Sequence, residues 1–439
     1  MTTASAKNIS HRRVWQLAWP MILSNLSTPL LGIVDTAILG HLPQATHLAA
    51  VALGSSLVTF IFWSFGFLRM GTTSLTARAV GAGDALLEQA TLARSAVLAV
   101  TIGVALWLLQ WPLLPLLLGW LSQAGEVQNL ALDYSRIRVL AAPVVLINYV
   151  LVGWFIGRQN TRVPLLLMVV LNVANVVFDL VLVWWLGWGS AGAAWASLTA
   201  ELLALLVGWQ LLRRALKSGF VVAGLTLRWR EFRPLIIINS HLFVRTAALL
   251  LVFLFFTSQG ARLGETVLAA NAILMQLVGV VSYGLDGFAH AAEALVGRAA
   301  GARQRRQFVL ACSITGQWAA VTALVTALVL WLLGPNLISL FTDLAPVAAL
   351  ARDYFIWLPL FPLLAGAAYH MDGIYIGWGR PDVMQYTMLA SALLVFLPVW
   401  WLGSGNTALW LAFVAFNLSR GILLSGYLGH KLVKGAIWE

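Results

Sequence analysis

The sequence predicts an all-α integral membrane protein in which twelve transmembrane helices form two six-helix lobes. Three observations indicate this fold. First, 61% of the 439 residues are hydrophobic, only 10% are charged, and the mean hydropathy is +0.87. Second, apolar stretches of about 20 residues recur along the chain, and each can cross a hydrocarbon layer ~30 Å thick as a helix. Third, the second half of the chain repeats features of the first half.

The predicted spans follow one another through short connections, and the spans that start at 130 and 350 are expected to begin as surface helices. The first run has no small-residue cleavage site, so it is a retained span and not a secretory signal. In chain order, the spans are 14–39, 48–70, 90–111, 130–158, 163–186, 190–213, 233–258, 267–290, 306–332, 350–378, 383–402 and 406–430.

Basic residues concentrate on one predicted side of the membrane. Of the 27 Lys and Arg residues, 19 lie in segments on the side of the amino terminus, and one, Arg262, lies in the opposite loops. Loops rich in Lys and Arg stay in the cytoplasm. We therefore expect both termini in the cytoplasm, as an even number of crossings requires. The same distribution explains the net charge of +11 without a nucleic-acid partner.

An internal repeat divides the chain into two halves. A shift of 220 residues aligns "ARAVGAGD" (77–84) with "GRAAGARQ" (297–304), and Asp133-Tyr134 with Asp353-Tyr354. Because six spans is an even number, both halves enter the membrane in the same direction. Parallel repeats around a central cavity are a known transporter plan.

These halves define the predicted domains. Residues 1–218 form an amino-terminal lobe with a coupling-ion site, 219–232 form a cytoplasmic linker, and 233–439 form a carboxyl-terminal lobe.

Two aspartates lie at similar depth in the first and fifth spans. A charge at membrane depth costs roughly 2.5 to 3.5 kcal/mol, so such residues usually face a cavity and act on ions or protons. The alternative is a protonated Asp35 with a purely structural role, in which it forms a hydrogen bond to a Ser or Thr side chain. Helical spacing places each aspartate at the end of a polar stripe. The stripes are Thr28, Gly32 and Asp35, and Asn172, Asn175 and Asp179.

Only the amino-terminal half contains this acid pair, because the repeat places Phe255 where Asp35 stands. Burial and a second carboxylate both oppose ionisation, so we expect Asp35 to exchange a proton near neutral pH. Protonation would weaken the hold of a cavity on a cationic substrate.

Four motifs, in this order, resemble the multidrug and toxic compound extrusion (MATE) family, and within it the bacterial DinF type. The motifs are "PLLGIVDTAILGHL" in the first span, "FLRMGTTSLTARAVGAGD" at the end of the second, "NVANVVFDLVLV" in the fifth followed by "GSAGAAWAS", and "LDGFAHAAEALVGRAAGA" at the end of the eighth. The resemblance covers nearly the whole chain.

The resemblance implies an efflux antiporter of the bacterial inner membrane that exports amphipathic, often cationic compounds by alternating access. It assigns cation coupling to Asp35, Asn175 and Asp179, with a proton as the expected coupling ion, sodium as the alternative, and no cofactor. We expect a monomer in the lipid bilayer. The polar residues expected to line the cavity are Thr28, Thr36, Asn148, Asn172, Ser197, Thr199 and Glu201.

One departure from the family pattern concerns sodium. NorM-type relatives carry an acid in the seventh span for sodium binding, whereas span 233–258 of this chain contains none. Sodium use through a site in the carboxyl-terminal lobe is therefore not expected.

A separate cluster of charges lies at the cytoplasmic end of the eighth span. Asp286, His290 and Glu293 share one helical face, and Arg69 occupies the corresponding end of the second span. We interpret these groups as an ion-pair network rather than a metal site. We expect an inner gate in which Arg69 pairs with Asp286 or Glu293.

Three other functions agree less well with the sequence. A flippase for lipid-linked precursors, from the same superfamily, would need several basic residues in its cavity, and Arg245 is the one basic residue predicted well inside a span. A channel would not need an acid pair that occurs in the amino-terminal half alone. An enzyme would need a nucleophile with a base, or a metal motif, and the sequence contains neither.

Overall fold

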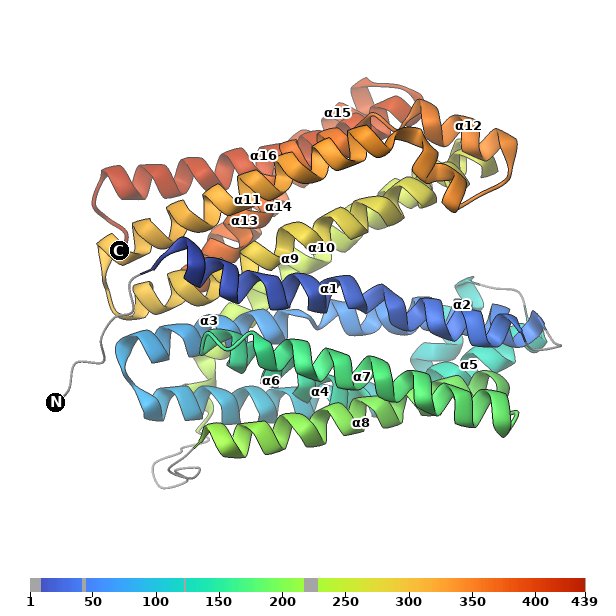
Figure 1. Ribbon diagram of the computed structural model, residues 1–439, viewed down its shortest axis with the longest axis horizontal. Helices are drawn as coiled ribbons and strands as arrows, with labels where there is room; N and C mark the ends of the chain where they lie inside the picture. Colours follow the sequence, from blue (N-terminus) through green and yellow to red (C-terminus); the bar gives the residue numbers. More distant parts are fainter. Residues whose placement is uncertain (1–8, 42–44, 122–123, 217–227, 439) are drawn as a thin grey trace. The chain divides into compact units, whose positions relative to one another are not determined.

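The computed structural model describes residues 9–41, 45–121, 124–216 and 228–438, except for the side chains of residues 29–31, 33, 36 and 335. All regular elements in these residues are helices, and they run as long rods in Figure 1. The first nine elements are α1 (His11–Gly40), α2 (Ala45–Ser64), α3 (Phe67–Ala82), α4 (Ala85–Leu121), α5 (Glu126–Leu140), α6 (Ala142–Gly157), α7 (Arg162–Asp179), the π-helix η1 (Leu180–Trp185) and α8 (Gly189–Ala215).

The second half of the chain is built in the same way. Its elements are α9 (Trp229–Arg262), α10 (Glu265–Gly301), α11 (Arg305–Leu333), the 3-10 helix η2 (Gly334–Leu340), α12 (Ala345–Asp353), α13 (Trp357–Trp378), α14 (Pro381–Ser391), the π-helix η3 (Ala392–Phe396), α15 (Leu397–Leu402) and α16 (Gly405–Val433).

These helices confirm the predicted membrane fold. Among the described residues, nine helices are long and apolar enough to cross a membrane, or eleven if each of two bent pairs counts as one span. Together with α1, they correspond one to one with the twelve predicted spans. Many large apolar side chains on them are exposed, among them Trp107, Trp185 and Trp401, as lipid-facing helices require.

The two spans that were expected to begin as surface helices are the bent pairs. α5 and α6 meet at an angle of 49°, and α12 and α13 meet at 48°. The structure differs from the prediction in the length of α4. This helix continues to Leu121, although its span was predicted to end at 111. Pro112 and Pro115 lie inside α4 without ending it, because a membrane penalises unpaired backbone groups and keeps the chain helical.

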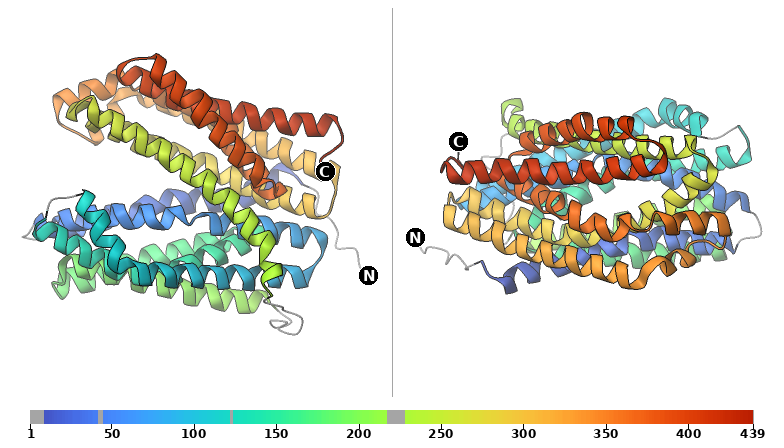
Figure 2. Two further views of the ribbon diagram at one scale, coloured as in Figure 1. Left: turned by 180° about the vertical axis from the view of Figure 1, so that it is seen from behind. Right: turned by 90° about the horizontal axis from the view of Figure 1, so that it is seen from above.

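The chain separates into two compact units. Unit 1 consists of Met1–Asn25, Ala77–Gly83 and Ile237–Glu439, and unit 2 consists of Leu26–Thr76 and Asp84–Ile236. In unit 2, α7 lies beside α8, and α4 lies beside α5 and α6 (Figures 1 and 2). In unit 1, α13 lies beside α10, α11 and α16. Of the predicted linker 219–232, residues 219–227 lie outside the described residues, and α9 begins at Trp229.

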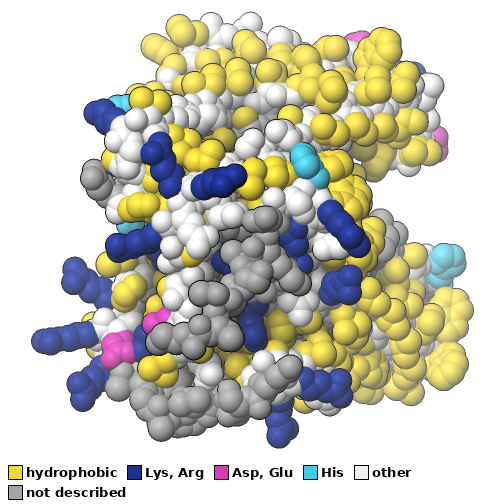
Figure 3. All heavy atoms as spheres, turned by 60° about the vertical axis from the view of Figure 1, so that its left-hand side comes forward, with side chains coloured by type: hydrophobic (Ala, Val, Ile, Leu, Met, Phe, Trp, Pro, Cys, Tyr) yellow, Lys and Arg dark blue, Asp and Glu magenta, His cyan; other side chains and the backbone are white. Residues whose placement is uncertain are grey.

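Charged side chains are unevenly distributed on the surface. Figure 3 shows many Lys and Arg side chains and few Asp and Glu side chains on the face that it draws, with hydrophobic side chains beside them. An excess of basic residues in short connections is typical of cytoplasmic loops. The cytoplasmic position of both termini stays a prediction.

The two aligned sequence repeats meet in unit 1. A Cβ atom on Gly81 would overlap the carbonyl oxygen of Arg298, and a Cβ atom on Gly301 would overlap the carbonyl oxygen of Arg78. These two contacts are reciprocal, since the 220-residue shift pairs Gly81 with Gly301 and Arg78 with Arg298. Glycine at both positions allows backbone to approach backbone without a side chain between them.

The substitution Gly81→Ala is expected to destabilise the protein by about 1 to 3 kcal/mol, because the added methyl group must displace a backbone. The measurement is the thermal unfolding midpoint of the purified protein in detergent. Gly83→Ala provides no matched control because Gly83 has a positive φ of 73°, whereas Gly119→Ala does, since nothing lies within 4 Å of a Cβ atom there. Equal midpoints for Gly81→Ala and Gly119→Ala would contradict this packing.

Candidate functional site

Unit 2 brings together the predicted acid pair. Asp35 on α1, Asn175 and Asp179 on α7, and Ser197 on α8 converge inside the unit. Asn175 and Asp179 have no exposed surface, Ser197 is 3% exposed and Asp35 is 6% exposed. Four polar side chains buried this deeply need hydrogen-bond partners inside the unit, because burial separates them from bulk solvent.

Asn175 links the two acids. Its amide nitrogen lies 3.2 Å from Asp35 Oδ1 and 3.1 Å from Asp179 Oδ2 when the amide is oriented to satisfy its neighbours. In this orientation the amide oxygen accepts a hydrogen bond from Ser197 Oγ at 3.3 Å. The opposite orientation would turn the amide oxygen toward two carboxyl groups that have only acceptors to offer when ionised. The amide therefore donates to both acids.

The two carboxyl groups share the Asn175 amide and interact with each other. Two ionised carboxylates this close would repel each other, and a proton on one of them would remove that repulsion. The arrangement is thus suited to holding one proton between two acids.

The helix that holds Asp179 changes its geometry directly after that residue. α7 ends at Asp179, and the π-helix η1 covers Leu180–Trp185. The N–H group of Leu180 bonds to the carbonyl groups of both Val176 and Val177. Short π-helical segments frequently occur at functional sites because they widen the helix locally.

Arg138 provides a fixed positive charge near the acid pair. It lies on α5 and interacts electrostatically with Asp35, Asp179 and Glu201. Its Nε and Nη1 atoms have no hydrogen-bond partner among the described residues. Sequence analysis assigned Arg138 no role, because an arginine near the end of an apolar span usually extends to the membrane interface. The available signal was an arginine inside an apolar span.

Glu201 forms a second polar pair in unit 2. Asn148 Nδ2 on α6 donates to Glu201 Oε2 at 2.8 Å and to the Glu201 carbonyl at 3.1 Å. Both residues were predicted to line the cavity, and the structure places them together near Arg138. Glu201 is therefore a third acid within reach of the same arginine.

The remaining predicted cavity residues take separate positions. Asn172 Nδ2 donates to the carbonyl of Ser27 at 3.2 Å, which joins the two predicted polar stripes. Thr199 Oγ1 donates to the carbonyl of Trp195 on its own helix at 2.9 Å. Thr28 is exposed. The side chain of Thr36 lies outside the described residues.

The predicted inner gate involves both units. Asp286 and Glu293 lie on α10 in unit 1, whereas Arg69 lies on α3 in unit 2. Within unit 1, His290 Nδ1 lies 3.1 Å from Glu293 Oε1. No three metal-ligating side chains cluster in the part of the chain that the structure describes. Pairing of Arg69 with either acid stays a prediction.

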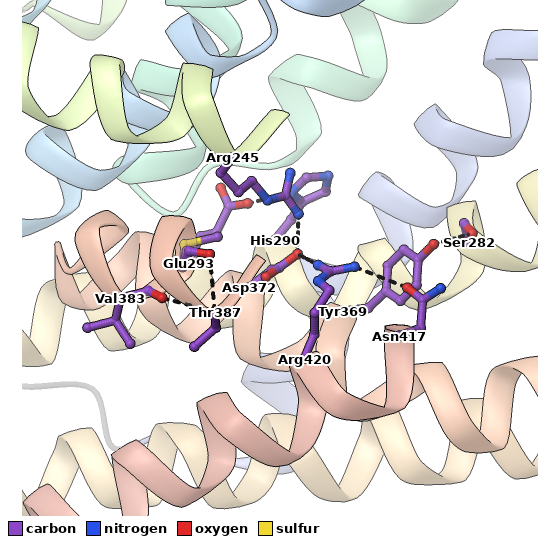
Figure 4. Close-up of polar contacts among 11 residues, drawn as sticks. Arg245, Ser282, His290, Glu293, Tyr369, Asp372, Val383, Thr387, Asn417 and Arg420 are labelled. Carbon is purple, nitrogen blue, oxygen red and sulfur yellow. Dashed lines mark hydrogen bonds and ion pairs between the residues drawn. The ribbon is translucent and has the colours of Figure 1, made fainter. Parts of the chain in front are cut away.

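Unit 1 contains a buried charge cluster of its own, which we call the arginine cluster and define as Arg245, Asp372 and Arg420. Figure 4 shows the carboxylate of Asp372 between the two guanidinium groups. Arg245 Nη2 and Arg420 Nη2 both donate to Asp372 Oδ2. The expectation that Arg245 is the one basic residue well inside a span is wrong, because Arg420 lies in the middle of α16.

Comparison with known proteins identifies the fold family. The MatE family model matches residues 20–181 and 242–402. The chain belongs to the MATE family. It is 39% identical over 421 residues to the DNA damage-inducible protein F of Escherichia coli, covering 95% of this chain and 91% of that protein. It is 24% identical over 366 residues to the probable multidrug resistance protein NorM of Neisseria meningitidis, covering 80% of this chain and 78% of that protein.

Solved structures agree with this assignment. A multidrug resistance MATE transporter of the MOP superfamily, in an outward-facing conformation, superposes with a TM-score of 0.88 at 21% identity, covering 98% of this chain and 97% of that one. The family model and the relative from Escherichia coli confirm the predicted family and subfamily. MATE proteins are membrane transporters of small molecules, so this chain is a transporter and not an enzyme.

The substitution Asn175→Ala is expected to lower substrate efflux driven by a pH gradient roughly tenfold to a hundredfold. The alanine removes two hydrogen bonds to acids, each worth about 1.5 to 3 kcal/mol. The measurement is dye efflux in everted vesicles. Asn172→Ala is the matched control, since Asn172 lies one turn from Asn175 on α7 and its amide donates to the backbone carbonyl of Ser27 instead of to an acid. Equal efflux by the two variants would show that Asn175 does not organise the acids.

Proposed function

We propose that this MATE protein is a proton-coupled antiporter of the bacterial inner membrane that exports amphipathic, often cationic compounds by alternating access. The observation that carries the proposal is the buried pair of Asp35 and Asp179, held by the single amide of Asn175. Ionisable residues inside a membrane protein mark ion and proton pathways. The names of the NorM relatives support efflux of several drugs.

The orientation of Asn175 favours a proton over sodium as the coupling ion. Sodium needs oxygen ligands, yet the amide turns its nitrogen toward the two carboxyl groups and its oxygen toward Ser197. Two buried carboxyl groups on one amide also favour a proton on one of them, because two negative charges there would repel each other. These two features support a proton as the coupling ion in this proposal.

Proton occupancy controls the charge of unit 2. With one shared proton, the pair carries one negative charge, and the positive charge of Arg138 acts on it. A second proton removes the remaining charge of the pair. A cationic substrate then loses its electrostatic attraction to the site, and the protonated form is free to adopt the other conformation. Loss of the proton on the cytoplasmic side restores binding.

The energy of one proton is sufficient for useful export. A membrane potential of about 100 mV provides ~2.3 kcal/mol per charge, and each pH unit adds ~1.4 kcal/mol. Together they support a substrate concentration ratio of a few hundred-fold for one proton per neutral substrate, at about 1.4 kcal/mol per tenfold. One acid pair therefore provides enough coupling.

The substitution Asp35→Asn is expected to leave folding and dye binding intact and to abolish efflux driven by a pH gradient, because the amide cannot exchange a proton. Dye binding is measured by fluorescence anisotropy, and efflux by dye movement in proteoliposomes with an imposed gradient. Asp133→Asn is the control, since Asp133 is exposed on α5 beside Arg136. Normal coupled efflux by Asp35→Asn would refute the proposal.

Sodium independence is tested at fixed pH. Efflux by the native protein is expected to be unchanged within about twofold when sodium is replaced by potassium, because the amide nitrogen of Asn175 faces the acids. Dye efflux and the pH inside the vesicles are recorded together. A requirement for sodium, with no movement of protons during efflux, would assign the acid pair to sodium instead.

A further inference from the structure

The arginine cluster lies deep inside unit 1. Arg245 is in the middle of α9, Asp372 is on α13, and Arg420 is in the middle of α16. Arg245 and Asp372 are each 8% exposed, and Arg420 is 3% exposed. The cluster therefore places three charges in the interior of one unit, at membrane depth, where each charge needs compensation.

The charges of the cluster do not balance. Both arginines donate to the same oxygen of one carboxylate, Asp372 Oδ2. Arg420 gains a further bond to Asn417 Oδ1 at 3.0 Å, which is a neutral acceptor. Arginine stays ionised in proteins, so the three groups together carry one positive charge. The neighbouring acid Glu293 already has His290 at 3.1 Å as a partner.

Arg245 has unused donor capacity. Its Nε atom is buried and has no hydrogen-bond partner among the described residues. A guanidinium group offers five N–H donors in a planar fork that matches a carboxylate or a sulfonate. Arg420, by contrast, uses its donors on Asp372 and Asn417. Arg245 is thus the member of the cluster that is prepared for another acceptor.

A purely structural role does not explain the second arginine. One arginine would neutralise Asp372 and join two helices, and a further buried cation would only add an energetic penalty. A lipid headgroup does not fit either, because the middle of a spanning helix lies roughly 15 Å from both headgroup layers. The acceptor must be a group that enters the interior of the unit.

We propose that Arg245 binds the anionic group of a transported compound, so that the arginine cluster makes unit 1 selective for amphipathic carboxylates and sulfonates. The proposal rests on the proposed efflux function. In it, Asp372 and Arg420 are positioning residues that hold the guanidinium group of Arg245 in place. The same arrangement prevents Asp372 from binding sodium, because two fixed cations already occupy its oxygen.

The test uses two dyes with the same xanthene ring and opposite charge, a cationic rhodamine ester and its anionic analogue sulforhodamine. Binding and efflux of both dyes are measured with the native protein and with Arg245→Met in proteoliposomes. Arg262→Met is the matched control, since Arg262 is exposed at the end of the same helix. We expect Arg245→Met to lose sulforhodamine binding and efflux by roughly tenfold to a hundredfold. Rhodamine efflux is expected to stay within about twofold.

The outcomes separate the two proposals. If the native protein moves neither dye, the proposed efflux function fails. If the native protein moves rhodamine but neither binds nor moves sulforhodamine, or if Arg245→Met changes both dyes equally, the anion site is refuted. If Arg245→Met does not fold, Arg245→Lys is used in its place. Lysine keeps the positive charge but lacks the planar, forked set of N–H donors of arginine. A KM increase of severalfold for sulforhodamine alone supports the site, and an equal change for both dyes overturns it.

Discussion

The structure depends on one hydrogen-bonded group, the amide of Asn175 between Asp35 and Asp179. Two acids on different helices repel each other when both are ionised, and burial increases this repulsion. The amide donates to both acids and so joins α1 to α7. In the proposed mechanism a proton on the pair removes the remaining repulsion, so a change in proton number would alter the contact between these two helices. This links the chemistry of the acid pair to the conformation of unit 2.

The duplicated scaffold supports two different interiors. In unit 1, the repeat places Phe255 at the position equivalent to Asp35. The Phe255 ring lies edge-to-face against Trp400 and Phe396, with ring centroids 4.8 Å and 5.5 Å apart. An aromatic cluster holds the helices there without ionisable groups. Unit 1 has a buried charge cluster elsewhere, the arginine cluster, and the net charge of that cluster is positive. Duplication thus preserved the helices and allowed the chemistry of each half to diverge.

Sequence reasoning predicted the fold well, because hydropathy over about 20 residues is a strong constraint in a membrane. It also brought Asp35, Asn175 and Asp179 into one site, since helical spacing and family motifs both pointed to them. It failed for Arg138 and Arg420, because an apolar span does not reveal which residue of another helix faces an arginine. The π-helix after Asp179 was equally invisible, since no residue type marks it. The cavity role of Thr28 and Thr199 stays a prediction.

The reciprocal contact at Gly81 and Gly301 has a consequence for motion. Where two helices touch through their main chains, no side chains interlock, and rotation of one helix on the other requires no change of rotamer. Such a junction would keep the distance between the two helices constant while their crossing angle changes. Gly81 lies against the backbone of Arg298, and Gly301 lies against the backbone of Arg78. Neither half could therefore have replaced its glycine independently after the duplication.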